Sequence, residues 1–331
     1  MAENVGEHVK LKKKILVTGG TGFVGGALLA RLVCRSDLQT LAWVRRVDAL
    51  LPVGVVPIPL SYNRTFAAGA QAEELHTVIH CAARVHVMGD KAHESLAVYR
   101  KVNVDITLDL ARSAVRAGAR RFIFISSIKV NGESSSPGQP FSASDTPAPI
   151  GPYALSKYEA EVGLRKISAE TGLEVVIIRL PLVYGPGVGG NFCSMMRWLS
   201  FGLPLPLGGL DNKRSMLSLS NLVDLIETCI DHPAAANQTL LVCDGEDLSV
   251  SELLRRLGAA MGRPARLLTM PAGWLVWVAR LLRREDVYAR LCGSLQVDMS
   301  TTRDLLGWTP PIRVDDALRS AAEDYIRRGR S

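Results

Sequence analysis

The stretch KILVTGGTGFVG, residues 14–25, decides the fold of this chain. It opens with a short β-branched run that stops at glycines, which is typical of a buried strand of a parallel sheet. Gly19 permits a tight turn, Gly22 lets an anionic ligand approach the backbone, and Gly25 allows the following helix to pack on the strand. A periodic apolar pattern then predicts a helix from Phe23 to Cys34. The N-terminus of this helix is suited to bind a phosphate-bearing ligand.

The same alternation of strand and helix continues along the chain. Strands that alternate with helices at this spacing predict βαβ units and a Rossmann-type, doubly wound parallel sheet, an α/β fold. Further strands are expected at Thr40–Val44, Thr77–His80, Arg121–Ile125 and Glu174–Ile178, and further helices at Val98–Ala117 and Tyr153–Thr171.

From about Tyr184 the pattern changes to Gly-rich and Pro-rich loops with shorter helices between them. This change indicates a smaller, mostly C-terminal region that covers the sheet and binds a substrate. We therefore expect a dinucleotide-binding domain over residues 11–183, with 215–245 returning to it. The substrate region is expected to consist of residues 184–214 and 246–331.

Composition excludes several classes of protein. The chain has 331 residues, of which 47% are hydrophobic and 21% charged, and this excludes a disordered protein. No segment approaches the roughly 20 apolar residues of a membrane span, and residues 1–14 lack the apolar stretch of a signal peptide, so we expect a cytoplasmic protein. The six cysteines are far apart and form no CxxC, which predicts reduced thiols and no metal site.

The formal net charge of +7 leaves nucleic acid, a membrane surface or an anionic small molecule as partner. Lys10 and residues 12–14 form only a short basic run without an RNA-binding or zinc-finger signature, so we expect no nucleic acid partner. The run Trp274–Ala279 precedes Arg280 and the pair Arg283–Arg284, which raises a membrane-surface helix as an alternative. Its shortness favours an ordinary core or cap helix. An anionic small molecule is the partner that the charge favours.

Two arginines follow the second predicted strand. In a dinucleotide-binding fold an acidic residue at this place holds the ribose hydroxyls of NAD, whereas a nearby Arg accommodates the 2′-phosphate of NADP. Here Arg45 and Arg46 occupy the place, and no carboxylate follows until Asp48. The pattern favours NADP(H), with NAD(H) as the alternative. Two solvated surface arginines are the competing interpretation.

The segment YALSK, residues 153–157, places a phenol and an ammonium group four residues apart, and therefore on one face of a helix. A neighbouring cation favours the phenolate, so we expect the pKa of Tyr153 to move from about 10 toward neutrality. Such a tyrosine can exchange a proton with a carbonyl or alcohol oxygen. Upstream, a predicted strand carries Ser126 and Ser127 at its C-terminal end, where ligands bind in open α/β sheets. An exposed Tyr–Lys pair on a helix surface is the alternative.

The glycine spacing and the order Ser127, Tyr153, Lys157 resemble the extended short-chain dehydrogenase/reductases, the NAD-dependent epimerase/dehydratase family, over nearly the whole chain. The resemblance implies that Ser127 hydrogen-bonds the reacting oxygen, Tyr153 transfers the proton, and Lys157 holds the cofactor ribose. It also implies a homodimer formed through the helices that carry Asn103 and Tyr153. The implied cofactor contacts are Gly19, Thr21, Gly22, Phe23, Val24, Gly25, Arg45, Arg46, Ala82, Ala83, Asn103, Tyr153 and Lys157.

The second half of the chain resembles the nucleotide-sugar clamp of UDP-glucose 4-epimerase relatives. In this resemblance Asn191 and Arg214 meet the diphosphate, and the loop around 205–207 meets the uracil. Lys129 either faces the substrate or lies on the surface, and His86 either borders the sugar or has a structural role. The implied substrate contacts are Arg84, Val85, His86, Ser127, Lys129, Tyr153, Asn191, Leu205, Leu207 and Arg214.

Three positions depart from the family pattern. Leu182 replaces a usual Asn, Ser61 stands where an adenine-binding Asp is common, and the acidic residue that selects NAD is missing. An epimerase recycles one bound NAD, whereas a biosynthetic reductase draws on NADPH. The missing acidic residue therefore favours NADPH-dependent reduction of a 4-keto sugar on a nucleotide. Residues 82–88 and 126–132 resemble bacterial enzymes of O-antigen and lipopolysaccharide synthesis, and this resemblance implies reduction of the C4 ketone of UDP-2-acetamido-2,6-dideoxy-4-hexulose.

Two alternatives to this reductase stay open. The first is an NAD-dependent nucleotide-sugar 4-epimerase of the UDP-glucose or UDP-GlcNAc type. The second is a non-catalytic dinucleotide sensor, although such proteins usually have a broken triad and all three members are present here. Either C4 configuration of the product, and more than one C2 substituent and base, are compatible with the pattern.

Overall fold

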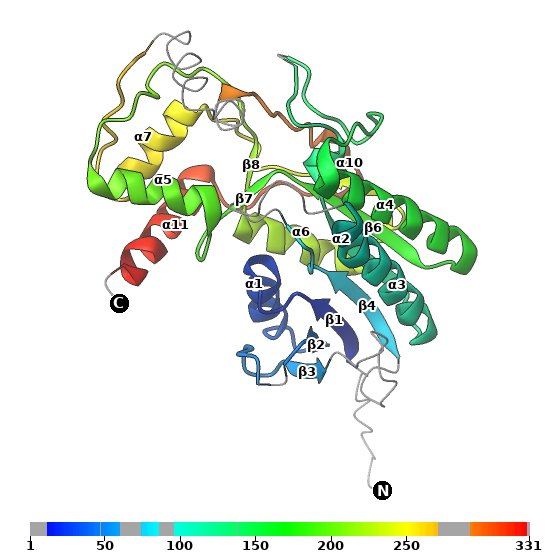
Figure 1. The fold of residues 1–331 in the computed structure, drawn as a ribbon. Coiled ribbons are helices and arrows are strands. Elements are labelled where there is room, and N and C mark those ends of the chain that lie inside the picture. The colour runs from blue at the N-terminus through cyan, green and yellow to red at the C-terminus, as the bar shows by residue number, and fades with distance from the viewer. Residues whose placement is uncertain are drawn as a thin grey trace, which may run out of the picture.

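A seven-stranded sheet forms the centre of the molecule (Figure 1). The computed structural model describes residues 12–46, 48–59, 74–85, 96–136, 138–270 and 292–329. All neighbouring strands of this sheet are parallel, in the order β3-β2-β1-β4-β5-β6-β9. The order reverses between β1 and β4, the place where doubly wound folds bind their ligands. The predicted Rossmann-type α/β fold is confirmed.

The strands consist mainly of apolar and β-branched residues because both faces of the sheet are covered. Their bounds are β1 Lys13–Thr18, β2 Leu38–Val44, β3 Val56–Pro59, β4 Leu75–His80, β5 Arg121–Ser127, β6 Glu174–Leu180 and β9 Thr239–Leu241. Two short parallel strands, β7 Leu182–Tyr184 and β8 Met216–Ser218, pair outside this sheet. Neither β3 nor β9 was predicted, because each has only three or four residues and β3 contains two prolines.

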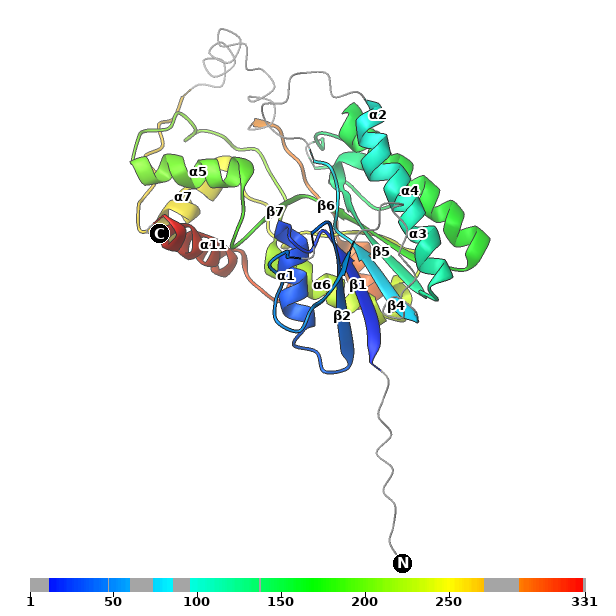
Figure 2. The same cartoon turned by 60° about the horizontal axis from the view of Figure 1, so that its bottom comes forward.

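Helices cover the sheet on both faces (Figures 1 and 2). Helices α1 and α6 cover one face of the sheet and pack against strand residues such as Ile15 and Val17. Helices α3 and α4 cover the other face and pack against strand residues such as Leu16 and Phe122. The longer helices are α1 Phe23–Leu32, α3 Ile106–Arg116, α4 Gly151–Thr171, α5 Gly190–Phe201, α6 Leu219–Asp231, α7 Val250–Ala260 and α11 Val314–Arg328. The shorter ones are α2 Leu96–Tyr99, α10 Ser300–Leu306 and single 3-10 turns at Ile128–Val130 and Pro233–Ala235.

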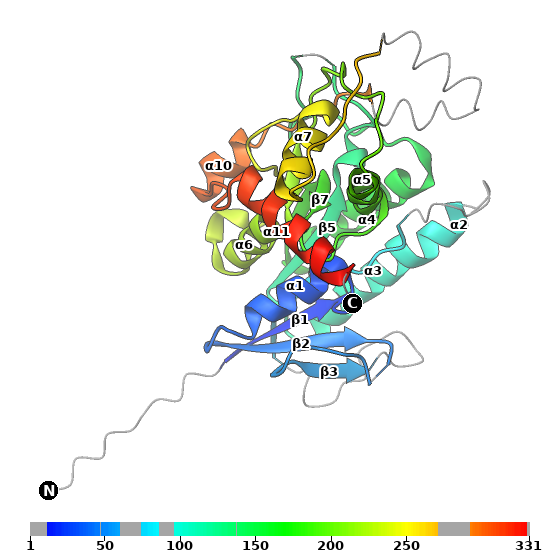
Figure 3. The ribbon, with the colours of Figure 1, turned by 90° about the vertical axis from the view of Figure 1, so that its left-hand side faces the viewer.

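Helices α5, α7 and α11 form a second group with its own apolar core around Tyr184 (Figure 3). The domain boundaries expected from the sequence stay a prediction. Within the part of the chain that the structure describes, no helix is both long and apolar enough to span a membrane. The expected run Trp274–Ala279 lies outside the described residues.

The helix expected over Val98–Ala117 is present, and the helical backbone runs without a gap from Leu96 to Arg116. Its hydrogen-bond pattern changes at Arg100–Asp105, six π-helical residues between α2 and α3. Such π turns insert an extra residue into a helix and are frequent at functional sites. Here the turn contains the buried Asn103, whose amide binds the backbone of Arg84.

A buried chain of hydrogen bonds joins β1 and β4 at the point where the strand order reverses. Thr107 donates its hydroxyl proton to the carbonyl of Asn103 (2.8 Å), so it accepts a hydrogen bond from Nε2 of His80 (2.9 Å). Burial lowers the pKa of His80 to about 3, so the ring is neutral and its Nδ1 accepts from the Thr18 hydroxyl (2.7 Å). The Thr18 oxygen in turn accepts from the backbone N–H of Ala82 (3.2 Å). The tautomer of His80 is therefore fixed with its proton on Nε2.

The buried His80 predicts a loss of stability in acid. The unfolded chain protonates His80 below pH 6.5, whereas the folded protein does so only near pH 3. The unfolded state therefore binds more protons between these values, and the free energy of unfolding falls by up to about 1.4 kcal/mol per pH unit as the pH decreases through this window. Urea denaturation of the wild type and of His80→Gln from pH 7.5 to 4.5 measures the difference in slope. Equal slopes for the two proteins would contradict the assignment.

Candidate active site

The turn between β1 and α1 needs glycine at two positions for steric reasons. Gly19 has φ +71°, and a Cβ there would lie 2.8 Å from the backbone nitrogen of Ala82. A Cβ on Gly25 would overlap the carbonyl oxygen of Gly19. The turn is closed by a hydrogen bond from Gly22 N–H to Gly19 O (2.8 Å). These contacts keep the turn, the following helix and the segment after β4 at van der Waals distance from one another.

The N-terminus of α1 is open to an anion. Gly22 is the N-cap residue, and within the described residues no side chain caps the helix and no acidic residue lies in its first turn. Unpaired N–H groups and the helix dipole attract a phosphate at such a place. The first turn begins with Phe23 and Val24, next to the exposed Thr21. These residues fit the pyrophosphate of a dinucleotide, whose binding there stays a prediction.

A cleft of about 910 Å³ runs from this turn between α1, α6 and α11, and includes Thr21, Gly22 and Phe23. On its other side stand Gly187 and Arg328. The backbone N–H of Gly187 donates to Oδ2 of Asp324 on α11 (2.7 Å). The last described helix thereby holds the turn that faces the glycine loop.

The structure brings Ser127, Tyr153 and Lys157 together at the carboxyl edge of the sheet. Ser127 is the last residue of β5, and Tyr153 and Lys157 lie one turn apart near the start of α4. Burial raises the pKa of Tyr153 to about 12, against the lowering effect of its hydrogen bond with Ser127. The expected shift of this phenol toward neutrality is therefore wrong for this structure, because desolvation of the phenolate outweighs the stabilising contacts.

The amine of Lys157 is buried against β5. Its Nζ donates to the carbonyl oxygen of Ile125 (2.8 Å) and lies 4.5 Å from the centre of the Phe124 ring. Burial lowers the pKa of Lys157 to about 8. The side chain is therefore still charged in neutral solution, and it is held by the strand that ends at Ser127.

Asn103 was predicted to contact the cofactor, and in the structure its side-chain amide forms hydrogen bonds with other residues of the protein. Oδ1 accepts from the N–H of Arg84 (2.8 Å), and Nδ2 donates to the carbonyl of Arg84 (3.1 Å) and to the hydroxyl of Ser156 (3.0 Å). Ser156 in turn donates to the carbonyl of Tyr153 (2.8 Å). Asn103 thus connects the segment Ala82–Arg84 to the first turn of α4.

A buried ion pair begins one helical turn beyond Lys157 on α4, and no sequence motif predicted it. The carboxylate of Glu161, 0% exposed, accepts from Nε (3.1 Å) and Nη2 (2.7 Å) of Arg179, which is 2% exposed. Ser126 donates its hydroxyl to the same carboxylate (2.6 Å), and Arg179 also donates to Oδ1 of Asn131 (2.9 Å). The pair joins α4, β5 and β6. Glu161 follows Lys157 by four residues, and this same-face spacing was the available signal.

The arginines proposed for the adenosine phosphate lie on the surface. Arg46 makes a two-point ion pair with Asp48 (3.0 and 2.6 Å), and both side chains are exposed. Arg45 is exposed beside it. The first carboxylate after β2 in the sequence is therefore that of Asp48, two residues after Arg46, and it neutralises the charge of Arg46.

Two of the expected sugar contacts, Val85 and Lys129, are among the described residues. Val85, 55% exposed, follows the segment that Asn103 holds. Lys129 follows Ser127 in a 3-10 turn, and its Nζ pairs with Glu133 (2.9 Å). His86, like the adenine candidate Ser61, lies outside the described residues.

The expected diphosphate and uracil contacts belong to the second region. Asn191 is exposed in the first turn of α5, and Arg214, half-buried, donates to the carbonyl of Gly293 (2.8 Å). The backbone of Leu205 is already paired, with its N–H on Arg266 O and its carbonyl accepting from Leu268 N–H (both 2.8 Å). The carbonyl of Leu207 accepts from the Ser251 hydroxyl. The backbone of Leu205 is thus engaged within the protein.

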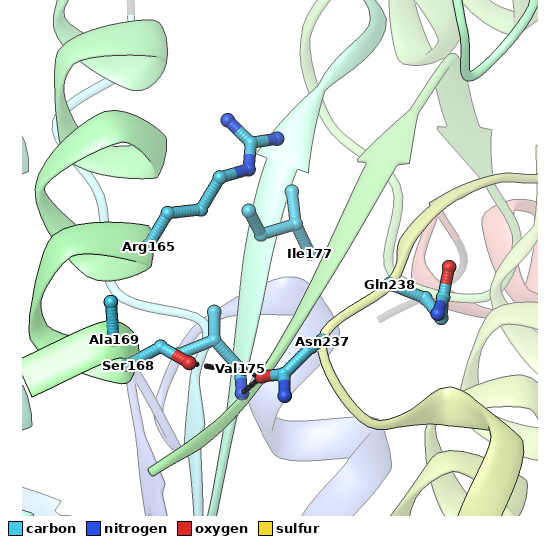
Figure 4. Close-up of a pocket in the computed structure, with 7 residues that line it drawn as sticks. All are labelled: Arg165, Ser168, Ala169, Val175, Ile177, Asn237 and Gln238. Atoms are coloured by element: carbon cyan, nitrogen blue, oxygen red, sulfur yellow. Dashed lines mark hydrogen bonds between the residues drawn. The ribbon is translucent and has the colours of Figure 1, made fainter. Parts of the chain in front are cut away.

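A second pocket lies at the opposite edge of the sheet, with a volume of about 270 Å³ (Figure 4). It is close to Val175, near the start of β6, whereas Ser127 stands beside the end of that strand. Asn237 accepts there from the Val175 N–H and from the Ser168 hydroxyl (both 3.0 Å). This pocket is therefore separate from the candidate active site.

A model of the NAD dependent epimerase/dehydratase family matches residues 15–243. The chain belongs to this family and is an NAD-dependent enzyme. A UDP-glucose 4-epimerase from Vibrio cholerae is 45% identical to it over 324 residues, which are 96% of this chain and 97% of the relative.

Two solved structures show the same fold. The UDP-glucuronic acid 4-epimerase of Bacillus cereus in complex with NAD has a TM-score of 0.75 at 19% identity, covering 95% of this chain and 99% of that one. The UDP-glucose 4-epimerase of Thermotoga maritima with UDP-glucose has a TM-score of 0.74 at 21% identity, covering 96% and 100%.

These findings correct the predicted reaction. The expectation of a UDP-4-keto-6-deoxy-hexosamine 4-reductase is wrong, because the 45% identical full-length relative is a 4-epimerase. The missing acidic residue after β2 explains the error, because that absence favours NADP(H) and thereby a reductase. The O-antigen role depended on the same reductase group and has no independent support.

The packing of Gly25 predicts a specific loss of dinucleotide binding. Gly25→Ala places a methyl group against the carbonyl of Gly19 and should open the turn, so we expect affinity for NAD to fall about tenfold or more. Gly189→Ala is the control, because no atom lies within 4 Å of its added Cβ. Isothermal titration with NAD measures both variants. Unchanged affinity in Gly25→Ala would contradict the proposed cradle.

The Glu161–Arg179 ion pair predicts that the free energy of unfolding depends strongly on keeping both charges or removing both. Glu161→Leu leaves a buried guanidinium without its carboxylate and should lower the free energy of unfolding by about 3–5 kcal/mol. The double variant Glu161→Leu/Arg179→Met should recover most of this loss. Glu170→Leu on the same helix removes an exposed ion pair and should cost less than about 1 kcal/mol. Urea denaturation compares the three proteins, and equal stability of the single and double Glu161 variants would argue against this role.

Proposed function

We propose that this protein is an NAD-dependent nucleotide-sugar 4-epimerase, which interconverts the C4 epimers of a UDP-hexose. The observation that carries the proposal is the 45% identity with the Vibrio cholerae UDP-glucose 4-epimerase over nearly the full length of both chains. The co-location of Ser127, Tyr153 and Lys157 supports it, because inversion of a secondary alcohol needs a group that removes and returns the hydroxyl proton.

In this proposal the glycine turn of residues 19–25 and Lys157 would hold NAD, which would supply reversible hydride transfer at C4 of the sugar. Tyr153 in its phenolate form would take the C4 hydroxyl proton during oxidation, become a neutral phenol, and return the proton during reduction. Ser127 hydrogen-bonds the same oxygen and stabilises the charge that develops on it. The substrate proton therefore stays on one phenol, and the protein needs no external reductant.

The protonation of Tyr153 depends on a balance between burial and its neighbours. Burial raises the pKa of Tyr153 to about 12, and the hydrogen bond with Ser127 opposes this effect. Burial lowers the pKa of Lys157 to about 8, which leaves this amine charged at neutral pH. A positive charge one helical turn away favours the phenolate. Lys157 thereby assists removal of the substrate proton.

The dinucleotide that we propose is NAD(H). The family is NAD-dependent, and the pairing of Arg46 with Asp48 reduces the positive charge available to a 2′-phosphate. The NADP preference expected from Arg45 and Arg46 has no support in the comparisons. Arg45 is the residue through which NADP(H) would be accommodated.

The substrate contacts follow from the same proposal. Arg214, with Asn191, would bind the diphosphate, and the loop 205–207 would lie against the base. Burial lowers the pKa of Arg214, and a partly desolvated guanidinium gains from a diphosphate partner. A homodimer through α3 and α4, which lie side by side on the outer face of the sheet, stays a prediction (Figure 2).

The decisive experiment is C4 interconversion without added reductant. We expect the purified protein to equilibrate UDP-glucose with UDP-galactose, measured by NMR with catalytic NAD. Tyr153→Phe should lower turnover about a hundredfold or more, while isothermal titration shows that NAD still binds. Tyr158→Phe, one residue beyond Lys157 on the same helix, is the matched control and should stay active.

Two outcomes would overturn the proposal. One is a protein that consumes NADPH in proportion to product, because an epimerase needs no net reductant. The other is full epimerase activity in Tyr153→Phe, because the proton would then move through another group.

A further inference from the structure

Two exposed aromatic rings stand at the C-terminal end of α5. Phe192, Met196 and Leu199 of this helix are buried in the second core, whereas Trp198 and Phe201 are 52% and 62% exposed. The two exposed rings contact each other edge-on, with their centres 6.5 Å apart. Among the large apolar side chains that are exposed in the described residues, these are the two aromatic ones. Exposed aromatic pairs of this kind mark interaction surfaces.

Neighbouring segments continue this apolar surface. Leu203 and Leu268 are 50% and 54% exposed. The strand-like segment after Leu203 pairs with the one that ends at Leu268, through hydrogen bonds of Leu205 with Arg266 and Leu268 (both 2.8 Å).

Arg263 ties the same segment to the helix, because its Nη1 donates to the carbonyl of Ser200 in the last turn of α5 (2.6 Å). We call Trp198, Phe201, Leu203 and Leu268, with Arg197, Arg263 and Arg266, the α5 patch.

The α5 patch is positively charged. Arg197, Arg263 and Arg266 are exposed, and none of them forms an ion pair within the described part of the chain. The sequence contains no Asp or Glu in residues 175–210 or 253–270, the two segments that build the patch. Within these two described segments, no carboxylate therefore balances the positive charge. The patch combines aromatic, aliphatic and arginine side chains, which is the composition of surfaces that enter the headgroup region of a bilayer.

We propose that the α5 patch docks the protein on an anionic phospholipid surface. Trp198 and Phe201 would enter the boundary between headgroups and acyl chains, and the arginines would contact lipid phosphates. Insertion of this kind needs protruding side chains and no complementary pocket on the partner. Two copies of the patch facing each other would bring the same uncompensated arginines together, which disfavours a symmetric dimer through this surface. The proposal is independent of the proposed enzymatic function.

Vesicle flotation tests this proposal. We expect the full-length protein to float with vesicles of phosphatidylglycerol and phosphatidylcholine, to bind pure phosphatidylcholine much less, and to be released at high salt. Trp198→Ser/Phe201→Ser should weaken binding about tenfold or more, since two large apolar side chains are removed from the contact. Leu50→Ser/Val53→Ser is the matched control, because these residues are 96% and 98% exposed on a segment between β2 and β3.

A second measurement reports on contact with the lipid directly. Brominated phosphatidylglycerol should quench tryptophan fluorescence in the wild type, and this quenching should decrease in Trp198→Phe although the variant still floats. Circular dichroism shows whether the serine variant folds, which we expect because both side chains are exposed.

Three results would overturn the proposal. The first is absence of flotation with anionic vesicles. The second is flotation that Trp198→Ser/Phe201→Ser leaves unchanged, which would place the contact elsewhere on the chain. The third is a change of the wild-type oligomer to a monomer in that variant, measured by light scattering, which would identify the patch as a protein–protein interface.

Discussion

The close approach of the β1–α1 turn to the segment after β4 is the constraint on which the rest of the site depends. Gly19 leaves no room for a side chain beside Ala82, and Thr18 and His80 lock the two strand ends together through hydrogen bonds of fixed direction. The same ring reaches Thr107, next to the π turn that carries Asn103, so one buried histidine connects the glycine loop with the helix layer on the other face of the sheet. These hydrogen bonds require a neutral His80 ring, and burial keeps the ring neutral by lowering its pKa.

The polar groups around Ser127, Tyr153 and Lys157 have two proposed roles. Some transfer the proton, and others fix the orientation of α4. Ser127 and Tyr153 interact with each other and form the proposed proton-transfer pair. Glu161 and Arg179 have their charges satisfied by each other and by Ser126 and Asn131, so they define how α4 lies against β5 and β6. A charge pair without solvent contact is costly to break, and this gives the proposed catalytic face of α4 a fixed orientation.

Local patterns predicted much of this arrangement, and long-range contacts account for the rest. The glycine spacing and the Tyr153–Lys157 spacing are properties of one turn or one helix face, so the sequence predicted them. The partners of His80 and Arg179 come from distant segments, and the proline-containing β3 has no periodicity to detect. The pKa of Tyr153 was predicted in the wrong direction, because its burial depends on the whole fold. The predicted reaction was wrong for a different reason: a triad that transfers the proton of a C4 oxygen is compatible with reductases and epimerases alike.

The hydrogen bond between Gly187 and Asp324 joins positions 137 residues apart. It completes the wall of the cleft opposite Phe23, whereas the glycine loop itself closes within a few residues of the first strand. Closing so long a loop costs more conformational entropy than closing the local glycine turn, so this wall depends on the docking of α11 more than the turn does. A change that loosens α11 would therefore reach Gly187 and the opposite side of the cleft while leaving the local Gly22–Gly19 hydrogen bond intact.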